Sequence, residues 1–114
     1  MGTGRSHALI DRINAAQDRL IAAKLRRDHR LVQVARRNLR RWVARDGRRV
    51  RQVFREWDQI LQRLTADQIA RFLVSDTPMC RRLRQSSPFV GVLSSAEVQA
   101  IRSKYEKTGS RMLS

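Results

Sequence analysis

The chain has 114 residues, of which 25 are Lys or Arg and only 10 are Asp or Glu, so its formal net charge is +15. This length suits one domain, or one domain with an arm. A hydrophobic fraction of 41% is too high for a wholly disordered basic tail. The sequence contains no run of about 18 apolar residues, which excludes a membrane-spanning helix.

Reactive side chains are scarce, and this excludes most catalytic classes. The histidines His7 and His29 have no partners at the spacing of a metal site or a catalytic triad. Cys80 is the single cysteine, so it forms no internal disulfide and fits a reducing compartment. We therefore expect a protein that is not an enzyme, with no cofactor, no metal and no small-molecule substrate. We expect it to be cytoplasmic, and nucleoid-associated if it binds DNA.

Residues 6–45 predict a long helix with Ser6 as its N-cap. Apolar residues recur there at steps of four and three, at Leu9, Ile13, Ala16, Leu20 and Ala23. This is the spacing of a coiled-coil seam, so the helix is expected to pack lengthwise on another helix. We predict that Leu9, Ile13, Ala16 and Leu20 form a protein interface, with a homodimer through residues 9–23 as one form of it.

A polar stretch at 26–30 interrupts the seam, and an apolar stripe then resumes in a shifted phase from Leu31 to Trp42. Two alternatives follow: the helix bends near Asp28, or it continues with a phase shift. A continuous helix over 6–45 would be about 60 Å long, at 1.5 Å per residue. Asp46 and Gly47 form a turn signal at the end of this segment.

Residues 48–64 predict the clearest amphipathic helix, with apolar side chains at i, i+3, i+4 and i+7. Phe54 and Trp57 are its expected core anchors. A capping box beginning at Thr65 predicts a helix over 66–74, and a second one beginning at Ser94 predicts a helix over 95–107. Pro78 suits the first position of a helix between these two.

The predicted fold is therefore all-α, with a long N-terminal helix or helix pair followed by a compact bundle of short helices. Its parts are a basic N-terminal helical arm at 1–46, a compact helical domain at 47–107 and a flexible tail at 108–114. Within the short helix that Pro78 begins, Met79 and Leu83 would give the apolar side. The apolar loop residues around Phe89 are expected to fold back on the 48–64 helix.

Residues 26–55 hold most of the net charge, with 12 arginines and two acidic residues, or 12 − 2 = +10. We call these 12 arginines the arginine belt: Arg26, Arg27, Arg30, Arg36, Arg37, Arg40, Arg41, Arg45, Arg48, Arg49, Arg51 and Arg55. Guanidinium groups match phosphate geometry, so we predict that those from Arg26 to Arg49 contact nucleic acid. The alternative is an ordinary solvated helix face, although such a face usually mixes both signs of charge.

The stretch 64–84 resembles the helix-turn-helix motif of DNA-binding domains. The matching residues are Ile69, Ala70, Leu73, Val74, Ser75, Met79 and Leu83, although the turn lacks the usual glycine. The resemblance implies that the second helix presents its N-terminal part to the major groove. Thr77, Cys80 and Arg81 would then point toward bases, and Arg82 and Arg84 toward phosphates. The alternative is a pair of capped helices packed in a small core.

These observations predict a small, non-enzymatic protein that binds nucleic acid, with DNA favoured over RNA, through an arginine-rich helical surface. The alternative function is a basic helical adaptor or assembly protein. It would dock an acidic protein partner or sit inside a larger complex, and the seam at residues 9–23 motivates it.

Overall fold

The structure is a computed structural model that describes the backbone of residues 3–113 and the side chains of residues 7–107. Its elements are α1 (Thr3–Arg27), the 3₁₀ turn η1 (His29–Leu31), α2 (Val32–Asp46), α3 (Gln52–Arg63), α4 (Ala66–Leu73), α5 (Pro78–Arg84) and α6 (Ser95–Leu113). The described backbone contains no strand. This confirms the all-α class, with an N-terminal helix pair followed by a helical bundle.

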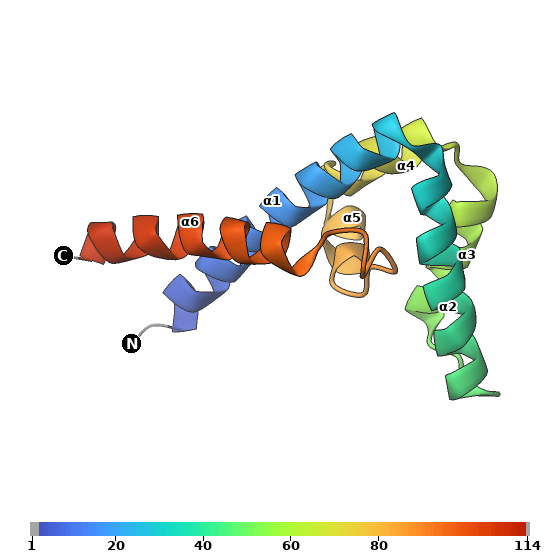
Figure 1. The fold of residues 1–114 in the computed structure, drawn as a ribbon. Helices are drawn as coiled ribbons and strands as arrows, with labels where there is room; N and C mark the ends of the chain where they lie inside the picture. The colour runs from blue at the N-terminus through green and yellow to red at the C-terminus, as the bar shows by residue number, and fades with distance from the viewer. Residues whose placement is uncertain (1–2, 114) are drawn as a thin grey trace.

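The long N-terminal segment bends at Asp28. This residue is extended (φ −142°, ψ 95°), and its carboxylate accepts a hydrogen bond from the backbone N–H of Arg30 at 3.1 Å. The apolar stripe changes phase at the same place, so a straight helix could not turn both halves of the stripe toward one core. Of the two predicted alternatives, the structure shows the bend, and α1 and α2 form the two arms of an arch (Figure 1).

In each arm of the arch, the helices that pack on α1 or α2 run in roughly the opposite direction to it (Figure 1). The first arm consists of α1 with α4 and α6 packed along it, and the second consists of α2 with α3 beside it. The loop at 88–93 and α5 lie between the arms. The seam of α1 predicts a helix partner, and α6 of the same chain packs on α1. Lys24 of α1 pairs with Glu97 of α6 at 2.5 Å.

One buried cluster joins helices α1 to α5 and the loop at 88–93. It includes Leu25 of α1, Leu39 of α2, Trp57 of α3 and Leu73 of α4, together with Leu83, Phe89 and Val92. The cluster therefore contains side chains from both sides of the boundary predicted at residues 46 and 47. Phe89 packs against Trp57, with 6.1 Å between ring centroids, as expected for a loop that folds back on α3.

Local signals placed several helix ends correctly. Thr65 and Gln68 form the predicted capping box, and so do Ser94 and Glu97. Pro78 occupies the first turn of α5. Three ends differ from the prediction. The first helix, α1, begins at Thr3, so Ser6 lies inside it and is not its N-cap. The third, α3, begins at Gln52, after a loop, and α6 continues to Leu113 through the segment predicted as a tail.

The buried side of α5 differs from the predicted one. Met79 is 50% exposed, whereas Cys80 is 4% exposed and packs inward with Leu83. The prediction chose the apolar pair four residues apart, but the structure buries the pair three residues apart. Either spacing places two side chains on one helix face, so a helix this short has no further residues to decide between them.

Replacing Trp57 by Phe should lower the free energy of unfolding by about 1–3 kcal/mol. The indole is fully buried, and its Nε1 donates a hydrogen bond of 2.8 Å to the carbonyl oxygen of Leu83, which a phenyl ring cannot supply. Urea unfolding of both proteins measures the difference. Trp42→Phe is the matched control, because the half-buried Trp42 ring packs on Phe54 and donates no hydrogen bond to another described residue. Equal losses in the two variants would contradict the prediction.

Candidate nucleic-acid interface

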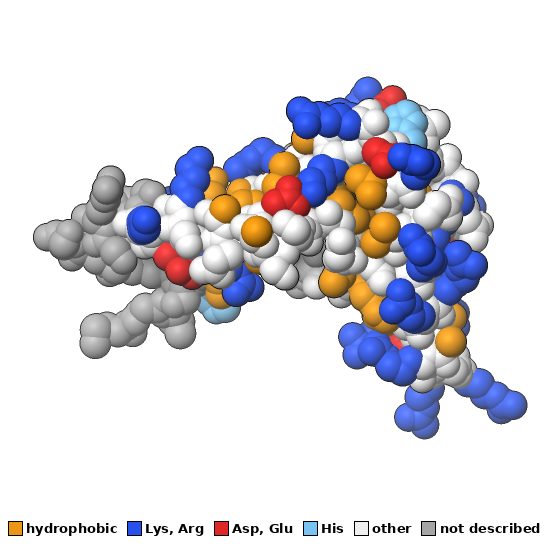
Figure 2. Space-filling model, in the orientation of Figure 1, with side chains coloured by type: hydrophobic (Ala, Val, Ile, Leu, Met, Phe, Trp, Pro, Cys, Tyr) orange, Lys and Arg blue, Asp and Glu red, His pale blue; other side chains and the backbone are white. Residues whose placement is uncertain are grey.

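The arginine belt extends from the corner of the arch to the far end of the second arm. Arg26 and Arg27 end α1, Arg30 lies in η1, five belt arginines lie on α2, and Arg55 lies on α3. Arg48, Arg49 and Arg51 occupy the loop that connects α2 to α3. All 12 are exposed, and Figure 2 shows Lys and Arg side chains gathered at the corner and along the second arm.

The connection between α2 and α3 depends on Gly47. Its φ of +61° lies in the region that favours glycine, and its N–H caps α2 by donating to the carbonyl oxygen of Val43 at 3.1 Å. The chain then turns back at once, and α3 packs on α2 through Leu39, Phe54 and Leu61 of the core. This turn places the loop arginines at the tip of the helix pair.

Most of the belt charge is not neutralised by nearby acids. Arg30 pairs with Asp28 at 2.9 Å. Hydrogen bonds from the side chain and the backbone of Arg30 hold the pKa of Asp28 below its usual value. Arg45 lies 3.7 Å from Asp46. The other ten belt arginines form no ion pair with any carboxylate in the described part of the chain. Ten guanidinium groups are therefore available to an external anion.

Three of these ten make other contacts. Arg36 donates to the carbonyl oxygen of Leu61 at 2.9 Å, and Arg37 donates to that of Gln33 at 3.4 Å. The Arg51 guanidinium lies 5.6 Å from the centre of the Phe54 ring. Each contact holds a side chain in place without cancelling its charge, which reduces the entropy lost when it binds a ligand.

An open groove of about 830 Å³ lies between α2 and α3. Leu39, Val43 and Phe54 are among the apolar residues that line it, and Arg36, Arg40 and Arg55 are its basic residues. Asp58 is the acidic residue of the lining, and its carboxylate accepts a hydrogen bond from Gln62 at 2.9 Å. A groove lined mainly by one sign of charge strengthens the local electrostatic field.

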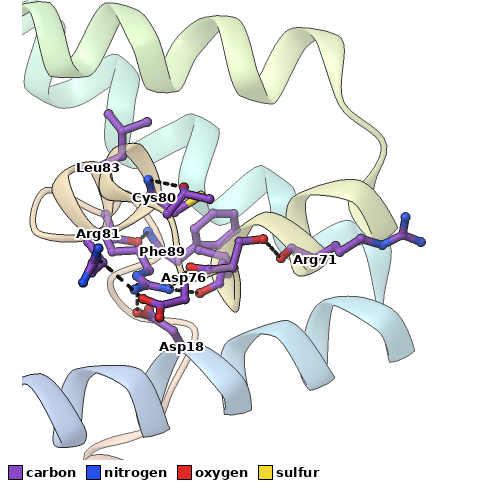
Figure 3. Close-up of polar contacts among 12 residues, drawn as sticks. Asp18, Arg71, Asp76, Cys80, Arg81, Leu83 and Phe89 are labelled. Atoms are coloured by element: carbon purple, nitrogen blue, oxygen red, sulfur yellow. Dashed lines mark hydrogen bonds and ion pairs between the residues drawn. The ribbon is translucent and has the colours of Figure 1, made fainter.

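The second predicted basic site, on α5, has a different environment. Arg82 pairs with Glu56 at 2.6 Å, and Arg81 lies 3.6 Å from Asp76. The Thr77 hydroxyl accepts a hydrogen bond from the backbone N–H of Cys80, so it serves as the N-cap of α5. Figure 3 shows Arg81, Asp76 and Asp18 gathered beside this helix. The cations of α5 are thus paired within the chain, whereas ten of the 12 belt arginines have no carboxylate partner among the described residues.

Arg84 points into the protein rather than toward solvent. Its Nε lies 3.5 Å from Asp18 Oδ2, and its Nη1 donates to the carbonyl oxygens of Leu73 at 2.9 Å and Ser75 at 2.8 Å. The side chains of Arg84 and Asp18 are only 16% and 10% exposed. Burial raises the pKa of Asp18 to about 6, against the opposing effect of the Arg84 charge. We therefore leave Arg84 out of the candidate interface.

Sequence reasoning missed this buried pair, although the sequence contains one signal of it. Asp18 lies three and four residues before Ile21 and Ala22, both of which are buried, so it shares their face of α1. A carboxylate on an apolar helix face indicates a buried partner of opposite charge. Nothing local in the sequence identifies Arg84 as that partner, because the two residues lie far apart in the chain.

The predicted protein interface on α1 is partly covered by the same chain. Ile13 is 8% exposed, and Leu9, Ala16 and Leu20 are half-buried. Ile13 and Leu20 lie on the same face of α1 as Lys24. Lys24 contacts Glu97, so this face is turned toward α6. Much of the seam thus packs within the chain, and a homodimer through residues 9–23 stays a prediction.

The described part of the chain contains neither a metal-site cluster nor a membrane-spanning helix. No group of three or more His, Cys, Asp or Glu side chains is placed there to hold a metal ion. None of the helices in this part is both long and apolar enough to cross a membrane.

Comparison of the chain with models of protein families, with curated proteins and with solved structures yields no match.

Proposed function

We propose that this chain is a non-enzymatic nucleic-acid-binding protein that holds phosphates through the arginine belt, and that DNA is its preferred ligand. The supporting observation is the contrast between the two basic regions. Ten belt arginines are exposed and have no carboxylate partner among the described residues, whereas Arg81, Arg82 and Arg84 each pair with one. Unpaired like charges on one surface repel each other, and a polyanion relieves this repulsion.

Arginine suits a nucleic-acid ligand better than lysine does. The guanidinium group binds phosphate oxygens with two parallel hydrogen bonds and also stacks on bases, which an ammonium group does not do. Residues 26–55, which contain the belt, include no lysine. When the arginines bind the phosphates of a nucleic acid, the counterions condensed on those phosphates are released. This release supplies a large share of the affinity of such complexes.

Replacing Arg36, Arg37, Arg40 and Arg41 by Gln should weaken binding to duplex DNA roughly a hundredfold or more at low salt, because four guanidinium contacts to the nucleic acid are lost. A gel-shift series with duplex DNA, single-stranded DNA and RNA at two salt concentrations measures this loss and ranks the ligands. The matched control removes four exposed arginines outside the belt: Arg12, Arg63, Arg71 and Arg102. Similar losses in both variants would show that net charge, not the belt, determines binding.

The groove between α2 and α3 supports a second candidate, docking of an acidic protein partner. Its half-buried Val43 and Val50 could contact apolar side chains, while Arg36 and Arg40 could pair with carboxylates. Polyglutamate at the same charge concentration is the test. If it displaces the chain from duplex DNA as well as unlabelled DNA does, the second candidate gains support, and if it fails to compete, the first does.

A further inference from the structure

The arginines of α2 cover one side of this helix. Successive residues of an α-helix are rotated by about 100°, so each position can be placed relative to the buried Leu39, which faces α3. Arg36 and Arg40 lie roughly 60–100° from Leu39, and Arg37 and Arg41 lie roughly 160° from it on either side. Arg45 lies about 120° from Leu39, on the same side as Arg41. The five arginines together therefore span about half of the circumference of α2.

The remaining flank of α2 is occupied by the chain itself. The Asn38 side chain donates hydrogen bonds of 2.9 Å and 2.8 Å to the carbonyl oxygens of Pro88 and Val90. The Trp42 ring packs on Phe54, with 5.2 Å between centroids. The helix is therefore fixed on two sides by protein and presents its arginine side to solvent. A rigid helix held in this way loses little freedom when it binds.

The dimensions of this exposed side match the major groove of B-form DNA. An α-helix with its side chains is about 10–12 Å across, and the major groove is about 12 Å wide and 8.5 Å deep. The 15 residues of α2 extend about 22 Å. Further belt arginines lie at both ends, with Arg26 and Arg27 at the corner and Arg48 and Arg49 at the tip. These end positions suit contacts to phosphates that border the groove.

Given the proposed function, on which this step rests, we infer that α2 is the helix that enters the major groove of duplex DNA. Arg37 and Arg41, opposite the core, face the base edges, and Arg36, Arg40 and Arg45 face the phosphates on either side. Arginine pairs with O6 and N7 of guanine, which both lie in this groove. The major groove of A-form RNA is too narrow for a helix, so duplex RNA is the excluded ligand.

This assignment differs from the one that the helix-turn-helix resemblance implies. That resemblance makes α5 the helix that enters the groove. Two α5 arginines are paired at its surface, and the third, Arg84, is buried with Asp18. A phosphate would have to compete with these carboxylates, whereas no carboxylate in the described residues pairs with Arg36, Arg37, Arg40 or Arg41.

Methylation interference with the full chain tests which groove is occupied. Dimethyl sulfate methylates guanine N7 in the major groove and adenine N3 in the minor groove of the same duplex, so one reagent reports on both. We expect N7-methylated duplexes to be depleted from the bound fraction and N3-methylated duplexes to bind normally. A duplex RNA of the same sequence should bind at least tenfold more weakly than the DNA.

A pair of charge-matched variants assigns the effect to α2. Arg37→Gln with Arg41→Gln should abolish the N7 interference and lower affinity at least tenfold, since two bidentate contacts to guanine are lost. The control, Arg63→Gln with Arg102→Gln, removes two exposed charges on α3 and α6 and should retain the interference.

Two kinds of negative result have different meanings. Interference at adenine N3, equal binding of duplex RNA and DNA, or an unchanged N7 pattern in the Arg37 and Arg41 variant would overturn the placement of α2 in the major groove. In each of these cases the chain still binds nucleic acid, so the proposed function stands. Failure to bind any nucleic acid at low salt would overturn both proposals together.

Discussion

Raising the salt concentration from 50 to 200 mM should lower the affinity of the chain for duplex DNA by about 10³–10⁵, if six to ten phosphates are contacted. Ten belt arginines lack a carboxylate partner among the described residues, so the surface can supply this number of contacts. Each contact releases counterions from the duplex, and added salt opposes that release. Fluorescence anisotropy of a labelled duplex across this salt range measures the slope directly.

The Gln variant at Arg36, Arg37, Arg40 and Arg41 provides the internal comparison for this slope. Each phosphate contact contributes about 0.9 to the slope of log affinity against log salt. Arg36 and Arg40 face phosphates and Arg37 and Arg41 face base edges, so losing the two phosphate contacts should reduce the slope by roughly 1.8. The charge-matched variant at Arg12, Arg63, Arg71 and Arg102 should keep the original slope. A flat salt response of the unmodified chain would show that phosphates are not the ligand.

Sequence reasoning succeeded where the determining interactions are local. The capping boxes at Thr65 and Ser94 join residues three positions apart, and both are present in the structure. The apolar stripe of α3 also identified Phe54 and Trp57 as core residues, because a complete i, i+3, i+4, i+7 pattern leaves one choice of buried face. These signals need no knowledge of the rest of the fold.

The fold was harder to predict where long-range packing decides between local alternatives. The segment around Asp28 could have continued as a helix or bent, and the shared core of both arms requires the bend. The short helix α5 offered Met79 or Cys80 as its second buried residue, and its neighbours bury Cys80. In each case the outcome depends on elements that are distant in sequence.

The candidate site shows the same division. Composition alone identified the arginine belt, because 12 arginines with two acids in 30 residues are visible in the sequence. Composition could not show which arginines are paired, because the partners of Arg82 and Arg84 are Glu56 and Asp18, far away along the chain. Pairing in three dimensions separates the belt from α5, and this separation moves the candidate groove-binding helix from α5 to α2.

Replacing the buried Arg84 by Met should lower the free energy of unfolding by about 3–5 kcal/mol at pH 7, because Asp18 would remain buried without its cation. Arg84 also donates to the carbonyl oxygens of Leu73 and Ser75, so its loss removes the link between α5, the end of α4 and α1. Chemical unfolding at pH 7 measures this loss. The pair of the exposed Arg82 with the half-buried Glu56 is the control, and Arg82→Met should cost less than about 1 kcal/mol.

The effect of Arg84→Met should depend on pH, and the direction follows from Asp18. Burial raises the pKa of Asp18 from 3.8 to about 6 in the folded chain, so between these values the folded chain keeps a proton that the unfolded chain has lost. The contribution of Asp18 to stability therefore falls as pH rises through this window, by up to about 3 kcal/mol, and is constant above it. Asp18→Asn should remove this part of the pH dependence.

Without Arg84, the neutral form of Asp18 is favoured further, because the arginine charge lowers the pKa of this carboxyl. The loss caused by Arg84→Met should thus be smaller at pH 4, where Asp18 is protonated in the folded chain, than at pH 7. Adding Asp18→Asn to Arg84→Met should recover part of the stability at pH 7. An equal loss at both pH values would show that the hydrogen bonds of Arg84 to Leu73 and Ser75, rather than its charge on Asp18, stabilise this junction of three helices.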